Sequence, residues 1–147
     1  TPLYSSAASD VYKRQVLIQT RYPQHPLYAA VRSHDYDTFA TELLEERQQA
    51  SFPPFIYQAL LRAEAKEIQI ALDFLHDAIA RVDYPGITMN DPIPMTMTRV
   101  ANVDRAQLLV ECTSRPALQA FLKVWIAALR EMKTRVRWSL EVDPVDI

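Results

Sequence analysis

One glycine, Gly86, occurs in the 147 residues of this chain, whereas glycine makes up about 7% of an average protein. Loops that cradle phosphate groups need several glycines, because this residue lets the backbone approach a phosphate closely. The sequence therefore excludes a Walker A loop, a dinucleotide-binding fingerprint and the glycine-rich loop of kinases. A complete nucleotide-hydrolysis site is excluded with them.

Cysteine and histidine give little support to a metal site. Cys112 is the only cysteine, so the chain has neither an intrachain disulfide nor a zinc site built from thiolates. The three histidines (His25, His34 and His76) lack the HExxH spacing of zinc proteases. We therefore expect no cofactor and no metal in this stretch of chain.

The sequence shows no signal for a membrane or for export. No run approaches 18 consecutive apolar residues, and no basic-then-apolar secretory signal stands at the beginning. Hydrophobic residues make up 49% and charged residues 23%, as in a soluble globular protein. We expect a reducing, cytoplasmic setting and no membrane partner.

Residues 1–15 show neither helical nor strand periodicity. One interpretation is a frayed terminus. The other is that the tract is not native, because it resembles adapter-derived sequence at the ends of translated metagenomic reads. We favour the second interpretation, exclude the tract from fold reasoning, and expect a truncated gene product that begins at Val16.

Three elements are predicted before a domain boundary: a strand, a short helix and a longer acidic helix (16–20, 27–33 and 37–49). Pro26 can open the short helix at its first position. Asp35 or Asp37 caps the longer one. Pro53 and Pro54 cannot continue a helix, so residues 16–51 form one part of the chain and residues 52–147 another.

The second part reads as β-α-β-β-α-β, with strands at 56–63, 95–100, 105–112 and 135–142 and helices at 66–82 and 114–132. The residues from Tyr84 to Gly86 predict a turn. The apolar side chains of the helices recur at helical spacing (Ile68, Leu72, Leu75, Ile79, Val82; Leu118, Phe121, Leu122, Trp125, Leu129, Met132). In the last strand Val136, Trp138, Leu140 and Val142 point inward. These patterns predict an α+β domain with two helices on one face of a four-stranded sheet.

Charge is distributed unevenly although the net charge is only −2. Residues 34–91 contain eleven acids against four bases, and residues 99–137 contain eight bases against three acids. A basic module beside an acidic one is typical of a nucleic-acid contact on one side. Ordinary solvation of long cationic side chains is an equally good explanation on sequence alone.

Five arginines in the basic part are candidate ligand contacts. Arg135 and Arg137 lie on one face of the last predicted strand, about 7 Å apart, which suits adjacent phosphates. Arg99 and Arg105 flank a turn that a nucleic-acid backbone can reach. Arg115 lies beside the N-cap of a helix, where unpaired amides and the helix dipole favour an anion. No residue is a catalytic candidate, because the adjacent Glu45 and Glu46 point in different directions and have no nucleophile near them in sequence.

Several segments resemble, in order, the C-terminal region of the bacterial primosomal replication-restart helicases, the PriA or primosomal protein N′ family. They are VLIQT (16–20), YPQHPL (22–27), DY (35–36) with Phe39, LEER (44–47), FPPF (52–55) and the ending VRWSLEVDP (136–144). The match runs from Val16 to Ile147.

The resemblance implies that residues 16–20 are the last strand of the second helicase lobe and that residues 26–51 connect it to a C-terminal domain. That domain is similar in fold to a small-subunit ribosomal protein. The family comprises ATP-dependent 3′–5′ DNA helicases that recognise stalled forks and reload the replisome. Its ATP- and Mg-binding motifs, arginine finger and zinc-binding cysteines precede Val16, so this stretch corresponds to a DNA- and partner-binding part that is not itself an enzyme.

The family also implies roles for individual residues. Residues 98–105 match a glycine-rich basic turn with an aromatic-Arg pair; this chain keeps Arg99 and Arg105 but lacks the glycines and the aromatic residue. Residues 113–115 match the start of a helix that helps to hold the acidic tail of single-stranded-DNA-binding protein, a role for Arg115. The implied partners are branched or single-stranded DNA, single-stranded-DNA-binding protein and other primosome proteins. The alternative is a protein-interaction module with little DNA affinity of its own.

Overall fold

The computed structural model describes residues 17–145, and the chain divides between Leu43 and Leu44 into two compact units. The non-native tract predicted at residues 1–15 lies outside the described residues, as does Val16. The predicted domain boundary between residues 51 and 52 stays a prediction.

The first unit contains α1 (Pro26–Ser33) and most of α2 (Tyr36–Gln49). Pro26 opens α1 as predicted, and Nδ1 of His25 accepts a hydrogen bond from the Leu27 N–H at 3.2 Å. Asp35 caps α2, because its Oδ1 accepts from the Thr38 N–H at 3.1 Å. Both predicted helices are therefore confirmed.

The prediction of a strand at residues 16–20 is wrong for residues 17–20, which the structure describes. Residues 17–20 form no strand, and Leu17 is 91% exposed. A strand is stable only when a neighbouring strand takes up its backbone N–H and C=O groups. No strand of the described chain pairs with this segment, so its backbone groups have no ladder to join.

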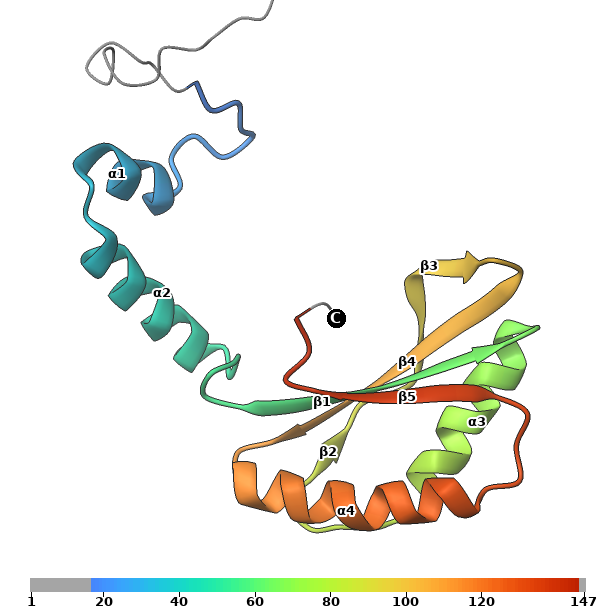
Figure 1. Ribbon diagram of the computed structural model, residues 1–147. Helices are drawn as coiled ribbons and strands as arrows, with labels where there is room; N and C mark the ends of the chain where they lie inside the picture. The colour runs from blue at the N-terminus through green and yellow to red at the C-terminus, as the bar shows by residue number, and fades with distance from the viewer. Residues whose placement is uncertain (1–16, 146–147) are drawn as a thin grey trace, which may run out of the picture. The chain divides into compact units, whose positions relative to one another are not determined.

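The second unit has two layers, an antiparallel sheet and the helices that pack against it (Figure 1). Its elements are β1 (Tyr57–Ala65), α3 (Ile68–Ala80), β2 (Thr88–Met89), β3 (Ile93–Val100), β4 (Val103–Cys112), α4 (Arg115–Glu131) and β5 (Arg137–Val142). The predicted β-α-β-β-α-β order is confirmed, with β2 as an additional strand of two residues. The predicted similarity to a ribosomal protein stays a prediction.

All strand pairs are antiparallel, and the strand order is β2-β4-β1-β5. Strand β3 also pairs with β4, on the same side as β2 but nearer the beginning of β4. Thus β2 and β3 share one edge of the sheet and β5 forms the other. Each helix connects two strands that have another strand between them, which is the split β-α-β arrangement. The central strands β1 and β4 come from distant parts of the sequence.

Both helices pack on the same face of the sheet, as predicted. Trp125 of α4 is fully buried, and its Nε1–H donates to the backbone O of Ala78 in α3 at 2.8 Å. Phe121 lies between two aromatic neighbours, with ring centroids 5.7 Å from Tyr84 and 5.2 Å from Trp125. The core joins α3, α4 and the inward residues of β1 and β4 (Ala59, Leu61, Ala63, Ala71, Phe74, Leu75, Ala78, Ala106, Leu108, Val110, Cys112, Leu118, Phe121, Leu122, Trp125 and Leu129).

The buried stripe of α3 is rotated slightly from the predicted one. Leu75 is fully buried, but Ile68, Leu72, Ile79 and Val82 are only partly buried against the core. The most buried positions include Ala71 and Ala78. Small side chains allow the helix axis to approach the sheet closely, and the larger apolar residues then border the contact.

The chain makes its tight turns largely without glycine. Among residues 17–145, five residues other than glycine have a positive φ: His34, Ser51, Ala101, Asn102 and Asp143. Ala101 and Asn102, with φ values of 49° and 64°, form the two-residue turn between β3 and β4. Two consecutive positive φ values match the right-handed twist of a hairpin. Gly86, with φ 79°, forms the predicted turn before β2.

The last strand is shorter than predicted. It begins at Arg137 rather than Arg135, and its pairing with β1 starts at Glu64 opposite Arg137. Just before it, the Thr134 Oγ1 accepts from the Val136 N–H at 3.0 Å. This local side-chain bond replaces a ladder bond, so Arg135 lies in the loop before the strand. Val142, predicted to point inward, is 41% exposed at the other end of this edge strand.

Candidate functional site

Three of the predicted arginines lie at one end of the sheet, where β1 ends and β4 and β5 begin. Glu64 of β1 lies directly opposite Arg105 of β4 on one side and Arg137 of β5 on the other. Arg99, at the end of β3, lies opposite Asp104. The register therefore brings together side chains that are up to 73 residues apart in sequence.

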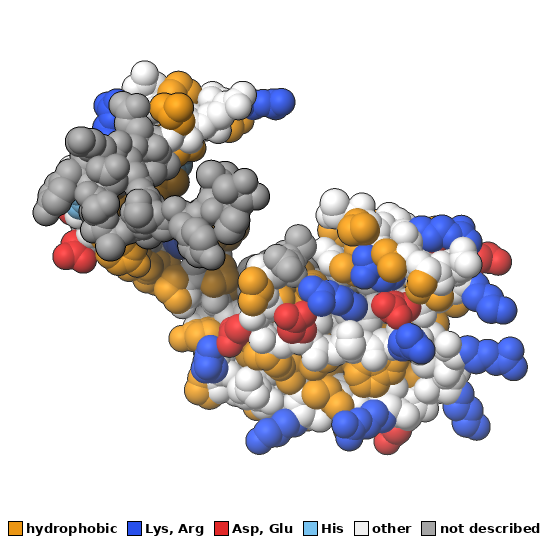
Figure 2. All heavy atoms as spheres, turned by 45° about the horizontal axis from the view of Figure 1, so that its top comes forward, with side chains coloured by type: hydrophobic (Ala, Val, Ile, Leu, Met, Phe, Trp, Pro, Cys, Tyr) orange, Lys and Arg blue, Asp and Glu red, His pale blue; other side chains and the backbone are white. Residues whose placement is uncertain are grey.

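Exposed cations from other elements join this end. Lys66 follows β1, and the loop from α4 to β5 carries Lys133 and Arg135. We call Lys66, Arg99, Lys133, Arg135 and Arg137, all of them exposed, the basic end. Figure 2 shows Lys and Arg side chains gathered along one edge of the second unit. A concentration of cations on one edge attracts a polyanion more strongly than the net charge of −2 suggests.

The ion pairs at the basic end are long, and their arginine side chains are exposed. Arg137 Nη1 lies 3.7 Å from Glu64 Oε2, and the Arg137 side chain is 85% exposed. Arg99 Nε lies 3.7 Å from Asp104 Oδ1, with an exposed fraction of 63%. Such pairs contribute little stability, because water screens them and both side chains lose freedom. Their guanidinium groups keep most of their donors available to a ligand.

Arg105 differs from its neighbours. Its Nε and Nη2 donate hydrogen bonds to the backbone O of Met97, at 3.3 and 2.9 Å. Met97 lies in an irregular part of β3, between Pro94 opposite Ala106 and Arg99 opposite Asp104. Arg105 thus holds the bulge of the hairpin, a role that the sequence alone did not indicate.

Arg135 does not share a strand face with Arg137. It is exposed in the loop that precedes β5, because the side chain of Thr134 bonds the Val136 N–H there. The expected spacing of about 7 Å along one strand therefore does not apply to this pair.

Arg115 lies at the opposite end of the sheet, as the first residue of α4. Its Nη2 lies 2.6 Å from Oδ2 of Asp143, the residue that follows β5. Its guanidinium carbon is 5.2 Å from the centre of the Tyr57 ring. An arginine predicted to bind a carboxylate thus binds one that belongs to its own chain. Ser114 caps the helix beside it, accepting from the Ala117 N–H at 3.4 Å.

The sheet face opposite the helices carries a polar network that the sequence did not reveal. Gln58 and Asn90 donate to the two carboxylate oxygens of Glu111, at 2.8 and 3.1 Å. Arg62 and Glu141 form an ion pair of 2.8 Å. Among the described strand residues of this face none is aromatic. The face therefore offers no platform on which nucleic-acid bases can stack.

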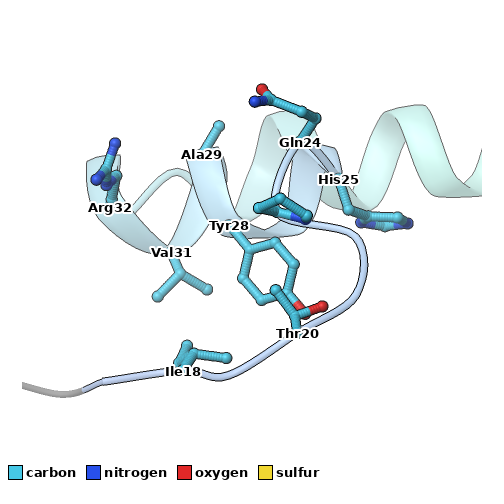
Figure 3. Close-up of a pocket in the computed structure, with 9 residues that line it drawn as sticks. Ile18, Thr20, Gln24, His25, Tyr28, Ala29, Val31 and Arg32 are labelled. Atoms are coloured by element: carbon cyan, nitrogen blue, oxygen red, sulfur yellow. The ribbon is translucent and has the colours of Figure 1, made fainter.

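The first unit holds a separate open pocket of about 640 Å³, shown in Figure 3. Its lining includes Ile18, His25, Tyr28 and Arg32, and the Tyr28 ring points from α1 toward Thr20. None of the five predicted arginines lines it. Across residues 17–145, no three His, Cys, Asp or Glu side chains are grouped so that they can hold a metal ion. No helix in this part of the chain is long and apolar enough to cross a membrane.

A family model and two related proteins assign this chain to the same family. A family model described as the C-terminal domain of primosomal protein N matches residues 48–145. The replication restart protein PriA of Haemophilus influenzae is 35% identical over 136 residues, which cover 90% of this chain and 19% of that protein. Its counterpart in Synechocystis is 30% identical over 140 residues, covering 90% and 16%.

Among solved structures, the de novo designed protein Foldit4 aligns with a TM-score of 0.45 at 2% identity, over 60% of this chain and 97% of that one. The present chain spans less than a fifth of the length of the two relatives above. From the family match and these identities, the chain belongs to the primosomal protein N (PriA) family and carries the C-terminal domain of a replication restart protein.

Proposed function

We propose that the second unit is a DNA-binding part of a replication restart helicase, and that it holds branched or single-stranded DNA through the basic end. The observation that carries this proposal is the meeting of Lys66, Arg99, Lys133, Arg135 and Arg137 at one end of the sheet. In this proposal the stretch performs no catalysis itself. ATP-dependent unwinding, with its Mg and structural zinc, belongs to other parts of the full-length family protein.

The contact is with phosphates rather than bases. The exposed guanidinium groups of Arg99 and Arg137 are held only by ion pairs of 3.7 Å, so a phosphate can replace the carboxylate at little cost. Because the described strand residues of the face opposite the helices include no aromatic residue, the binding energy comes from charge and from released counterions. We expect weak dependence on base sequence and strong dependence on salt.

The test is a fluorescence-anisotropy titration of the full chain with single-stranded and forked DNA at about 50 and 200 mM salt. Each phosphate contact to a single strand contributes about −0.7 to the slope of log K against log salt. The double variant Arg99→Glu with Arg137→Glu should weaken binding at least about tenfold and flatten that slope. Lys123→Glu, an exposed cation in the middle of α4, is the control. Unchanged binding by a folded double variant would remove the basic end from the account.

A second proposal concerns Arg115 and has its own observation. Arg115 already holds a carboxylate beside an aromatic ring, which supports docking of the acidic tail of single-stranded-DNA-binding protein or of another primosome protein. Arg115→Glu should abolish binding of such a tail peptide and leave DNA binding intact. Equal loss of both activities, or loss of neither, would count against this docking role.

A further inference from the structure

The carboxylate of Asp143 reaches Arg115 from a distant part of the sequence. Arg115 begins α4 and Asp143 follows β5, and they meet with Nη2 and Oδ2 2.6 Å apart. Side-chain exposure is 58% for Arg115 and 49% for Asp143. A solvent-borne ligand can therefore reach the guanidinium without any opening of the core.

The backbone, and not only the ion pair, sets the position of Asp143. Its N–H donates to the backbone O of Gln58 at 2.9 Å, which continues the pairing of β5 with β1 by one residue. Its φ is 53°, in the left-handed region that Asp tolerates better than most residues. The carboxylate is thus presented to Arg115 at a high effective concentration.

We propose that Asp143 is an internal ligand of Arg115, and that it competes with the carboxylate of an acidic peptide for the same guanidinium edge. This inference rests on the proposed docking role of Arg115. Arginine binds a carboxylate best through two parallel N–H bonds, and Asp143 already takes an Nη2 hydrogen of Arg115. The incoming carboxylate has to displace it, so the apparent Kd equals the intrinsic Kd divided by the fraction of molecules in which Arg115 is free of Asp143.

The competing physical account is that Asp143 positions Arg115 for the peptide. Tyr57 lies 5.2 Å from the guanidinium carbon and orients the group independently of Asp143. On our proposal the removal of Asp143 therefore frees the site without disordering it. The two accounts predict opposite changes in affinity when Asp143 is replaced.

The experiment measures binding of a fluorescein-labelled acidic peptide with a free C-terminal carboxylate to the full chain, by anisotropy. Asp143→Asn should lower the Kd about two- to fivefold, the range expected when one exposed ion pair is removed. The charge-matched control is Asp77→Asn. Asp77 lines a groove with Lys133, and the neighbouring Ala78 accepts from Trp125, which lies ten residues, or about 15 Å, along α4 from Arg115.

A double-mutant cycle separates competition for Arg115 from a general change in charge. In an Arg115→Gln background, Asp143→Asn should leave the Kd unchanged. Tighter binding in that background overturns the proposal, and so does unchanged or weaker binding by Asp143→Asn alone. In either case the docking role still stands if Arg115→Gln itself weakens binding of the peptide. If the peptide binds neither the parent chain nor the Asp143→Asn variant, the docking role and the inference are both overturned.

Discussion

Arg105 of β4 donates two hydrogen bonds to the backbone O of Met97, in the neighbouring strand β3. The guanidinium thereby fixes the irregular stretch of β3 that ends at Arg99. Of two arginines that flank the same turn, one organises the hairpin and the other extends into solvent. The two should respond differently to mutation.

Arg105→Ala should loosen the hairpin. We expect a loss of about 1 kcal/mol in the free energy of unfolding, because hydrogen bonds from a charged donor contribute about this much or more. Hydrogen exchange of the amides at residues 95–98 should accelerate, while the salt slope of DNA binding stays the same. A reduced salt slope with unchanged exchange would show instead that Arg105 contacts phosphate.

Glu64→Gln should strengthen DNA binding about two- to threefold. Glu64 lies between Arg105 and Arg137 in the sheet register and forms an ion pair of 3.7 Å with Arg137. Its neutralisation frees Arg137 and removes a charge that repels phosphate. Anisotropy at about 50 mM salt measures the change. Glu42→Gln, in α2, is the control, and an equal gain in that variant would reject a local effect.

Ala101→Gly should stabilise the second unit. Ala101 has a φ of 49° in the turn between β3 and β4, and a left-handed conformation costs a residue with a Cβ about 1–2 kcal/mol. Part of that gain is lost because glycine makes the unfolded chain more flexible. We expect a net gain of about 0.5–1 kcal/mol in chemical denaturation. Ala120→Gly, at an exposed position of α4, should instead cost about 1 kcal/mol.

Trp125→Phe should destabilise the domain by about 1–3 kcal/mol. The Trp125 Nε1–H satisfies the carbonyl of Ala78 at 2.8 Å. Ala78 lies in the last turn of α3, where carbonyls have no partner within the helix. The variant keeps an aromatic ring in the core but leaves this carbonyl unpaired. Urea unfolding followed through the fluorescence of Trp138 measures the loss, and a loss below about 0.5 kcal/mol would show that the hydrogen bond contributes little.

The sequence predicted those elements whose signal is local and periodic. The stripe of α4 from Leu118 to Leu129 is buried as expected, because a period of 3.6 residues on a 17-residue helix leaves few alternatives. The caps at Asp35 and Ser114 were likewise readable from residue type. Strand β2 has only two residues, too few for any periodicity, and its pairing with β4 depends on the rest of the sheet.

The candidate site was less predictable, because its contacts join distant segments. Arg137 was correctly placed in a strand, but its partner Glu64 follows only from the register of β5 against β1. The pairing of Arg115 with Asp143 spans 28 residues and has no local signature. The role of Arg105 depends on a bulge in β3, and the residue pattern of that strand does not predict the bulge. Tertiary register, rather than residue type, decided each of these contacts.

Strand β1 also sets the distance between the two ends of the sheet. Tyr57, beside Arg115, and Glu64, beside Arg137, stand at its two ends, seven steps or about 23 Å apart. One B-form strand carries a phosphate every 3.4 Å or so, so about seven phosphates cover that length. Under the two proposed binding roles, a short peptide tail beside Tyr57 and a nucleic-acid strand beside Glu64 would be held at a spacing that the central strand sets.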